Sequence, residues 1–437
     1  MHEGLEQMRA RRRDFLKIAA VGGLVSQSAV AQTCPVLTPA NTTKFFFNVT
    51  EPPFNAVHDG MTDDTAAIQL AITTAQAAGG GIVILPAGKY LVAGTLLIDG
   101  TNYYYGVGVE LHGVGPHRTD LVVPAGTTVD TIVFKNTSSG AVRSLSISSC
   151  SSRAGGSSIR LENTTNVIID NFNTQNQFIA VRVNGGILQR IRTGYWHLGT
   201  NGTGLLIDGA NAQGVPSNDT HADRIVTVGG RYGFRIRRSG AVWLHGCESV
   251  QCEKGLLIDP LPGEGVTFSF FSDCAWDTTT SHCMHLSSFG TSFIHGLTFT
   301  NCWAASSSTG NCCVIEGSGV DGVELIGHRF VNSSVGNGLY VTSSAKNVHV
   351  DASVATCCPS GSGYCFVNGA NSFAIRNSHS GSYGSQGAWA LPSNSWGVTV
   401  GSGCTDYMVV NNTLKGNTTG SLQDLSLGPK VVANNLV

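Results

Sequence analysis

A short apolar segment recurs roughly every 25 residues through most of the chain, a spacing in the range typical of repeat proteins. Examples are residues 204–207, 233–236, 255–258 and 312–315. A small or turn-forming pair follows each segment, and a second short apolar strand comes next. Segments this short fit strands better than helices. We therefore predict a solenoid in which each coil packs only on its neighbours.

The composition agrees with a fold built from many strands and tight turns. Only 12% of the 437 residues are charged, whereas an ordinary globular domain has roughly 25%. Glycine is abundant, with 55 residues. The formal net charge of −2 offers no basic surface for nucleic acid, so we expect no nucleic-acid partner.

One segment near the N-terminus has helical rather than strand periodicity. Its apolar residues lie on one face of a helix spanning 65–78, and Asp63 or Asp64 is placed to cap its first turn. Three glycines at 79–81 end the helix, and a buried strand is expected at 82–85. The apolar positions are Ala67, Ile68, Ala71, Ile72 and Ala75.

The first 31 residues have the features of an export signal. Arg12 and Arg13 are followed by an apolar run at 18–31 that ends in Ala-Val-Ala, a pattern that signal peptidase cleaves. A membrane anchor needs about 20 apolar residues, so we expect cleavage rather than anchoring. We predict twin-arginine export to the periplasm or medium, with no stable membrane anchor.

The remaining chain divides into three parts. We expect an exposed lead-in at 32–50, an N-terminal cap with the first coils at 51–128, and the main coils at 129–437.

Aligned coils predict two columns of residues at one corner. The first column contains small polar residues that suit a tight turn: Asn171, Asp273, Asn301, Asn377 and Asn412. The next position holds Cys247, Cys274 and Cys302, which we expect to be buried, reduced and in line. Although the chain has 13 cysteines, its length favours small core residues over a disulfide framework.

The N-terminal motif permits a family resemblance. The sequence Asp-Gly-x-Thr-Asp-Asp-Thr-x-Ala-Ile at 59–68, the glycines at 79–81 and Pro-x-Gly-x-Tyr at 86–90 resemble the pectate-lyase-like superfamily. That superfamily includes polygalacturonases, rhamnogalacturonases and phage tailspike depolymerases. The resemblance implies an all-β, right-handed, single-stranded parallel β-helix with an N-terminal capping α-helix. It also implies a polysaccharide partner that binds along the first sheet.

The outer face of this first sheet follows from strand alternation. We place Ile207, Ile236, Ile258, Leu286, Ile315, Val341 and Val367 inward. The outward pairs, coil by coil, are then Arg182 and Asn184, Leu206 and Asp208, Arg235 and Arg237, Leu257 and Asp259, His285 and Ser287, Val314 and Glu316, Tyr340 and Thr342, and Phe366 and Asn368.

Two carboxylates on this face suggest a glycoside hydrolase. Asp208 and Asp259 lie two strands apart, about 9–10 Å at the backbone, and inverting glycosidases separate their carboxyls by roughly 6.5–9.5 Å. Arg237 between them would favour the ionised form of both, which suits a base and not an acid. A stabilising charge ladder is the structural alternative. Glu316 with His285 forms a second candidate pair.

A lyase requires other groups, and the same face contains them. Arg235, Arg237, His285 and Tyr340 could bind or deprotonate a uronate, and Arg182 extends the basic surface. Glu253, Lys254 and His282 lie just before the outward strands, where this superfamily often places functional groups. No acidic cluster suggests a calcium site, so we expect neither metal nor cofactor.

Two classes of function stay open. One is an exported carbohydrate-active enzyme, either a hydrolase or a lyase. The other is a non-catalytic glycan-binding or cell-surface protein on the same scaffold. The four polygalacturonase motifs are missing from the coil region, and Asp63-Asp64 is the only Asp-Asp pair. The oligomeric state is open, a homo-oligomer included.

Overall fold

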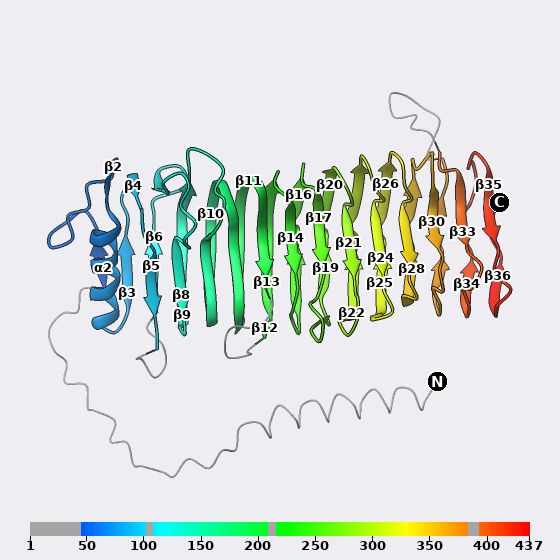
Figure 1. The fold of residues 1–437 in the computed structure, drawn as a ribbon, viewed down its shortest axis with the longest axis horizontal. Coiled ribbons are helices and arrows are strands. Elements are labelled where there is room, and N and C mark those ends of the chain that lie inside the picture. The colour runs from blue at the N-terminus through cyan, green and yellow to red at the C-terminus, as the bar shows by residue number, and fades with distance from the viewer. Residues whose placement is uncertain (1–44, 102–107, 209–215, 383–392) are drawn as a thin grey trace, which may run out of the picture. The chain divides into compact units, whose positions relative to one another are not determined.

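A computed structural model describes residues 45–101, 108–208, 216–382 and 393–437. This part of the chain is an all-β parallel β-helix of the right-handed type. Each strand pairs in parallel with a strand of the next coil, and the coils run in sequence order from blue to red (Figure 1). The proposed signal peptide lies outside the described residues.

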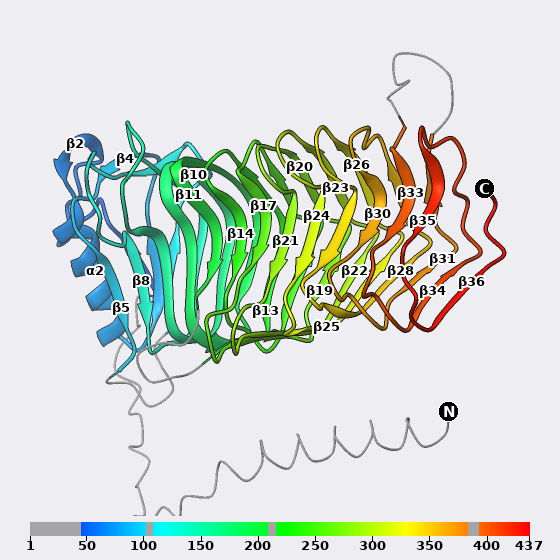
Figure 2. The same cartoon turned by 45° about the vertical axis from the view of Figure 1, so that its right-hand side comes forward.

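Three faces of the helix are visible in the turned view (Figure 2). The first sheet holds the recurring segments noted above. It consists of parts of β10 (Ser157–Ile187) and β11 (Arg190–Ile207), with β5 (Leu96–Asp99), β8 (Ile132–Lys135), β14 (Tyr232–Ile236), β17 (Lys254–Ile258), β21 (Met284–Ser287), β24 (Cys313–Glu316), β27 (Leu339–Thr342), β30 (Ser362–Phe366), β33 (Trp396–Val400) and β35 (Gly420–Asp424).

The second sheet follows in each coil. It contains parts of β9 (Ser138–Ser148), β10, β11 and β13 (Thr220–Val228), with β1 (Phe46–Asn48), β3 (Gly81–Ile84), β6 (Val109–His112), β15 (Val242–His245), β19 (Phe270–Ser272), β22 (Phe293–Thr300), β25 (Val320–Ile326), β28 (Lys346–Asp351), β31 (Ala374–Arg376), β34 (Tyr407–Val410) and β36 (Lys430–Ala433). Two short strands precede it in their coils: β12 (Ser217–Asn218) and β18 (Gly265–Thr267).

The third sheet closes each coil. It contains parts of β9, β10, β11 and β13, with β2 (Asp59–Asp63), β4 (Gly88–Leu91), β7 (Thr119–Val122), β16 (Glu248–Val250), β20 (Ala275–Thr279), β23 (Trp303–Ser307), β26 (Arg329–Ser333), β29 (Val354–Thr356) and β32 (His379–Ser380). Apolar side chains from all three sheets fill the interior in one continuous core.

The helix α2 (Thr65–Ala77) lies beside the first coils and buries one apolar face. The Asp63 carboxylate accepts a hydrogen bond from the Thr65 backbone N–H at 3.0 Å. Of the two predicted caps, Asp63 therefore bonds the first turn, whereas Asp64 occupies the N-cap position and makes no capping bond. Its buried carboxylate instead accepts the backbone N–H groups of Val57 and His58 at 2.7 and 3.0 Å.

The segment expected as an exposed lead-in contributes structure at its end. Strand β1 pairs with β3, and Phe47 and Val49 are buried. The core therefore begins within this segment.

One corner, between the second and third sheets, is turned by a single left-handed residue in each coil. The φ angles there lie between 46° and 64°, a region that L-residues other than Asn, Asp and Gly seldom adopt. Strand register places Asn171, Asp273, Asn301 and Asn377 in this column, as predicted. The full column is Ser144, Asn171, Thr193, Arg224, Gly246, Asp273, Asn301, Gly327, Ala352, Asn377, Asn411 and Asn434.

The assignment of Asn412 to that column was wrong by one residue. Asn411 makes the turn, with a φ of 58°, and Asn412 belongs to the next, buried column. Because two asparagines follow the end of β34 (Tyr407–Val410) directly, sequence alone offered no means of choosing between them. The Asn412 amide donates to the Ile375 carbonyl at 3.0 Å and accepts the Ser378 N–H at 2.9 Å.

The cysteine column lies where it was predicted. Cys247, Cys274 and Cys302 are each about 1% exposed and occupy equivalent positions in consecutive coils. Each thiol lies within 3.4–3.5 Å of a backbone carbonyl oxygen in the preceding coil.

Candidate functional site

The outer face of the first sheet has two rows of side chains. Ile207, Ile236, Ile258, Leu286, Ile315 and Val341 point inward as predicted. The next coil differs: Phe366 is buried and pairs with Val341, so Cys365 and Val367 point outward. The predicted inward Val367 and the outward pair of Phe366 and Asn368 were therefore wrong by one residue.

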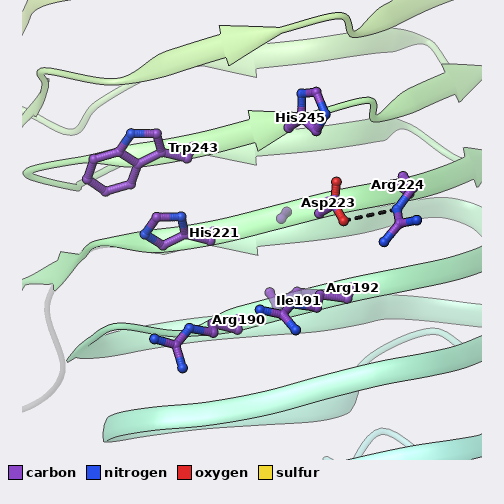
Figure 3. Close-up of a pocket in the computed structure, with 9 residues that line it drawn as sticks. Arg190, Ile191, Arg192, His221, Asp223, Arg224, Trp243 and His245 are labelled. Carbon is purple, nitrogen blue, oxygen red and sulfur yellow. Dashed lines mark hydrogen bonds and ion pairs between the residues drawn. The ribbon is translucent and has the colours of Figure 1, made fainter.

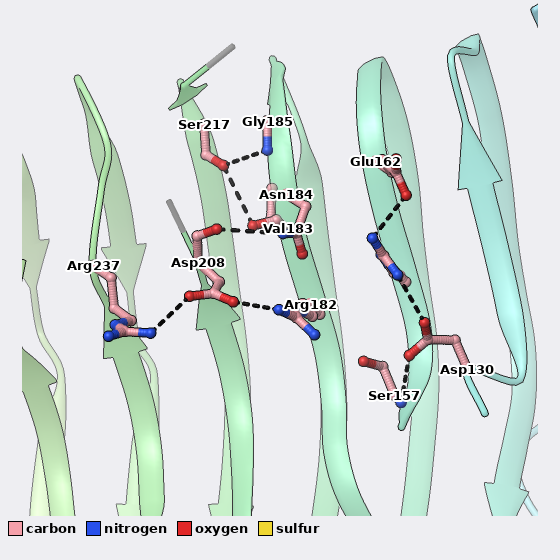
Figure 4. Close-up of polar contacts among 11 residues, drawn as sticks. Asp130, Ser157, Glu162, Arg182, Val183, Asn184, Gly185, Asp208, Ser217 and Arg237 are labelled. Atoms are coloured by element: carbon pink, nitrogen blue, oxygen red, sulfur yellow. Dashed lines mark hydrogen bonds and ion pairs between the residues drawn. The ribbon is translucent and has the colours of Figure 1, made fainter. Parts of the chain in front are cut away.

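Two aspartates on this face are held by arginines from neighbouring strands, and Figure 4 shows the first of them, Asp208. Asp208 is bonded by Arg182 at Oδ2 and by Arg237 Nη1 at Oδ1, the latter at 3.1 Å. In the following coils, Arg235 holds both oxygens of Asp259 in a two-point contact of 2.5 and 3.0 Å. All four carboxylate oxygens accept hydrogen bonds, so neither group offers a proton to a glycosidic oxygen.

A second set of titratable groups forms a continuous chain of hydrogen bonds across three strands. Lys254 Nζ lies 2.8 Å from His285 Nδ1, and His285 Nε2 lies 2.8 Å from Glu316 Oε1. The hydrogen bond from His285 lowers the pKa of Glu316, which keeps this group ionised. An ionised carboxylate only accepts, so His285 carries its proton on Nε2 and Nδ1 accepts from Lys254.

Burial lowers the pKa values of two basic groups here, Lys254 at one end of the hydrogen-bonded chain and His282 next to it. Desolvation lowers the pKa of Lys254 and outweighs the nearby carboxylates, which act in the opposite direction. Desolvation also lowers the pKa of His282 to about 4. His282 is thus neutral near neutral pH, and its Nδ1 accepts the Asn311 N–H at 3.1 Å.

A hollow of about 390 Å³ lies over this part of the sheet. Four candidates from the sequence line it: Arg237, Lys254, Asp259 and His285. Its remaining lining residues are Tyr232, Leu257, Pro260, Leu261, Pro262, Ser287 and Phe289.

The other candidates lie at varying distances from the hollow. Arg182 and Asp208 form an ion pair to one side of the hollow, and Arg235 forms an ion pair with Asp259. The His282 ring lies 5.1 Å from that of His285. Glu253 pairs with Arg231 at 3.3 Å. Tyr340 is one strand beyond Glu316, opposite Val314, and does not line the hollow.

Tyr232 is a candidate that the sequence reasoning missed. It pairs with Lys254 across adjacent strands, and its ring lies against the guanidinium groups of Arg231 and Arg235 at 5.0 and 4.9 Å. The alignment of Tyr232 with Lys254, immediately before the two Gly-initiated segments, was the available signal.

Within the described residues, no group of three or more His, Cys, Asp or Glu side chains could hold a metal ion. In the same part of the chain, no helix has the length and apolar character needed to span a membrane.

Comparisons with known proteins give a family match and local similarities. Residues 46–259 match the family described as rhamnogalacturonase A/epimerase, pectate lyase-like. Mannuronan C5-epimerase AlgE3 of Azotobacter vinelandii is 50% identical over 70 residues, which are 14% of this chain and 4% of that protein. Alginate lyase 7 of the same bacterium is 48% identical over 63 residues, or 13% and 7% of the respective chains. The matched segments thus span only a small part of these relatives.

A solved structure supports the fold alone. The Agl-KA catalytic domain superposes with a TM-score of 0.56 at 13% identity, covering 91% of this chain and 69% of that one.

Proposed function

We propose that this member of the pectate-lyase-like superfamily is a lyase that cleaves a uronic-acid polysaccharide by β-elimination. The hydrogen-bonded array of Lys254, His285 and Glu316 beside a hollow carries the proposal. The local similarity to an alginate lyase and to mannuronan C5-epimerases supports a uronate as substrate. The arginine-held aspartates support elimination over acid-catalysed hydrolysis.

The reaction needs no external oxidant or hydrolytic water. A base removes the proton at C5, next to the uronate carboxylate. The C5–H electrons form the C4–C5 double bond, and the bond from C4 to the glycosidic oxygen breaks. That oxygen leaves with a proton, which the protonated base can return, so atoms and charges balance.

Lys254 is the group that we assign to proton transfer. In the neutral form its amine donates one N–H to His285 Nδ1, which leaves its lone pair free for the C5 proton. Burial favours this neutral form. The resulting ammonium keeps the same bond to His285 and can protonate the leaving oxygen. His285 and Glu316 are positioning residues, because they act through Lys254.

Arg237 is the residue that we assign to the substrate carboxylate. It lines the hollow, and its Nε is a buried donor without a partner among the described residues. A guanidinium at the carboxylate would stabilise the charge that develops when C5 loses its proton. Tyr232 and Phe289 would bound the sugar-binding space.

C5-epimerisation is a second candidate, favoured by the similarity to mannuronan C5-epimerases. It begins with the same proton removal but returns a proton to the opposite face of C5, so the chain is not cleaved. The twin-arginine pattern at Arg12 and Arg13 supports export, which would bring the protein to extracellular glycans.

The experiment is a screen of polymannuronate, polyguluronate, polygalacturonate and neutral glycans with the purified protein. A lyase produces new reducing ends together with ultraviolet absorbance from the unsaturated uronate. New reducing ends without that absorbance would indicate hydrolysis and overturn the proposal. Deuterium incorporation at C5 in D₂O without cleavage would indicate epimerisation. Binding without either reaction would favour a non-catalytic glycan-binding protein.

A further inference from the structure

A second hollow, of about 350 Å³, lies on the second sheet, away from the face of the proposed active site (Figure 3). Strands β11, β13 and β15 form it, and two outward rows of side chains flank it. Its lining residues are Arg190, Ile191, Arg192, His221, Ala222, Asp223, Arg224, Trp243 and His245.

Stacked rings form one wall. The ring of His221 lies 4.4 Å from that of Trp243 with an interplanar angle of 5°. Trp243 in turn stacks on Phe270, at 5.9 Å and 19°. The ring faces cover one another along the helix axis, so the wall presents ring edges and is rigid across three coils. Burial lowers the pKa of His221, which leaves this wall uncharged at neutral pH.

Arginines make the hollow basic. Three arginines line it against a single aspartate. Arg224 Nε donates a hydrogen bond to Asp223 Oδ2 at 3.0 Å, and Arg190 Nη1 donates one to Asn166 Oδ1 at 2.9 Å. Arg192 is exposed and has no acceptor or ion-pair partner in the part of the chain that the structure describes. The arginines of the first sheet are paired with Asp208 and Asp259, whereas this cluster has a single aspartate.

We propose that this hollow is a second binding site, which holds an acidic polysaccharide by its carboxylates while another part of the polymer occupies the first sheet. Arg190 and Arg192 bind carboxylates, since guanidinium matches the planar geometry of that group. The ring edges of His221 and Trp243 contact the apolar faces of the sugars.

The geometry favours an extended glycan that lies along the helix axis. Neighbouring strands are about 4.8 Å apart, close to the length that one pyranose occupies in an extended chain. Arg190, His221 and Trp243 occupy one row on successive strands, so successive sugars would meet successive coils. The site does not use Lys254, His285 or Glu316, and binding there does not depend on the proposed chemistry.

The test is a fluorescence titration of the purified protein with polyuronate oligomers, with Trp243 as the reporter. We expect a saturable change in tryptophan fluorescence that Trp243→Phe removes. Arg192→Ala and Arg190→Ala should each weaken binding about 10-fold, the scale of one hydrogen bond to a charged group. Added salt should weaken binding further, because exposed charges are screened.

Arg329→Ala is the matched control, because Arg329 is exposed and lies on β26 in the third sheet. It should leave the titration unchanged. Two results would overturn the proposal: unchanged affinity in both arginine variants, or equal binding of a neutral glycan of the same length. Tighter binding of a nucleic acid or polyphosphate than of polyuronate would also overturn it, since it would assign the arginines to phosphate. Because Arg192 has no partner in the described residues, its substitution should leave the fold intact.

Discussion

Lys254 Nζ lies 2.8 Å from His285 Nδ1, although 31 residues separate the two in sequence. The contact exists because β17 and β21 are adjacent strands, and Lys254, at the start of β17, reaches diagonally to His285. It fixes the lysine amine over the hollow and occupies the imidazole nitrogen that faces it. The imidazole therefore cannot itself take the substrate proton, and Lys254 is the group left to do so.

Lys254→Ala should lower kcat by about 10²–10⁴-fold, the usual effect of losing a general base or acid. His285→Gln and Glu316→Gln should lower kcat less, because they misplace the amine without removing it. Steady-state kinetics on the best polyuronate would measure these effects. Lys346→Ala, on the second sheet, removes an equal charge and should leave kcat unchanged. A normal kcat in Lys254→Ala would place the base elsewhere.

The pH dependence of kcat/KM should follow the ionisation of the Lys254 amine. The base form of Lys254 exists above its pKa, which burial holds below the ordinary lysine value of about 10.4. We therefore expect kcat/KM to rise with pH and level off on the alkaline side, below that value.

Glu316→Gln tests the same assignment through the direction in which the pKa of Lys254 shifts. The Glu316 charge raises the pKa of Lys254, so its removal lowers that pKa. The rising limb of the profile should then move to lower pH while the plateau falls. A limb that moves to higher pH would contradict the assignment.

Asp208→Asn should show whether Asp208 stabilises the sheet as part of a charge ladder or acts as a catalytic carboxylate. Asp208 contacts Arg182 and Arg237, so its substitution loosens Arg237 and should raise KM more than it lowers kcat. We expect less than a 10-fold change in kcat. If Asp208 were a general acid or base, kcat would fall by about 10²–10⁴-fold.

Ala352→Gly should stabilise the fold. Ala352 turns its coil with a φ of 49°, a conformation that costs an L-residue about 1–2 kcal/mol and glycine almost nothing. Glycine's larger entropy in the unfolded chain offsets part of this gain, so we expect roughly 0.5–1 kcal/mol from denaturant unfolding. Ala355→Gly, inside β29, is the control and should destabilise. A loss of stability in Ala352→Gly would refute this reading of the corner.

The sequence predicted the coil architecture because the information for it is repeated. Period-two alternation and small residues at one corner recur in many coils, so an error in one coil leaves the register of the others intact. The errors occurred where repeats are ambiguous: at Asn411-Asn412, and at Cys365-Phe366-Val367, where apolar residues stand on both faces. The outward rows then followed directly, which is why Arg237, Asp259 and His285 were found. Lys254 was proposed separately, from its place just before the recurring segment at 255–258.

The contacts within the site could not be predicted in the same way. Register brings Arg235 opposite Leu257, yet its guanidinium reaches diagonally to Asp259. Which arginine holds which carboxylate depends on side-chain conformation. Tyr232 was missed because it lies before the recurring segment, where the alternation of strands gives no direction. The second hollow lies on a sheet for which the family resemblance implied no ligand.

The stacking of coils also governs how such a protein can change over generations. Lys254, His285 and Glu316 come from three consecutive coils and meet diagonally, because each lies at a different position along its strand. Duplication or loss of one whole coil elsewhere would lengthen or shorten the polymer track and leave these three in contact. Insertion of a coil between two of them would break the chain of hydrogen bonds while preserving the sequence around each residue. In this fold the order of the coils that carry the three residues keeps them in contact. The chemistry can therefore be retained even when no short sequence motif is conserved.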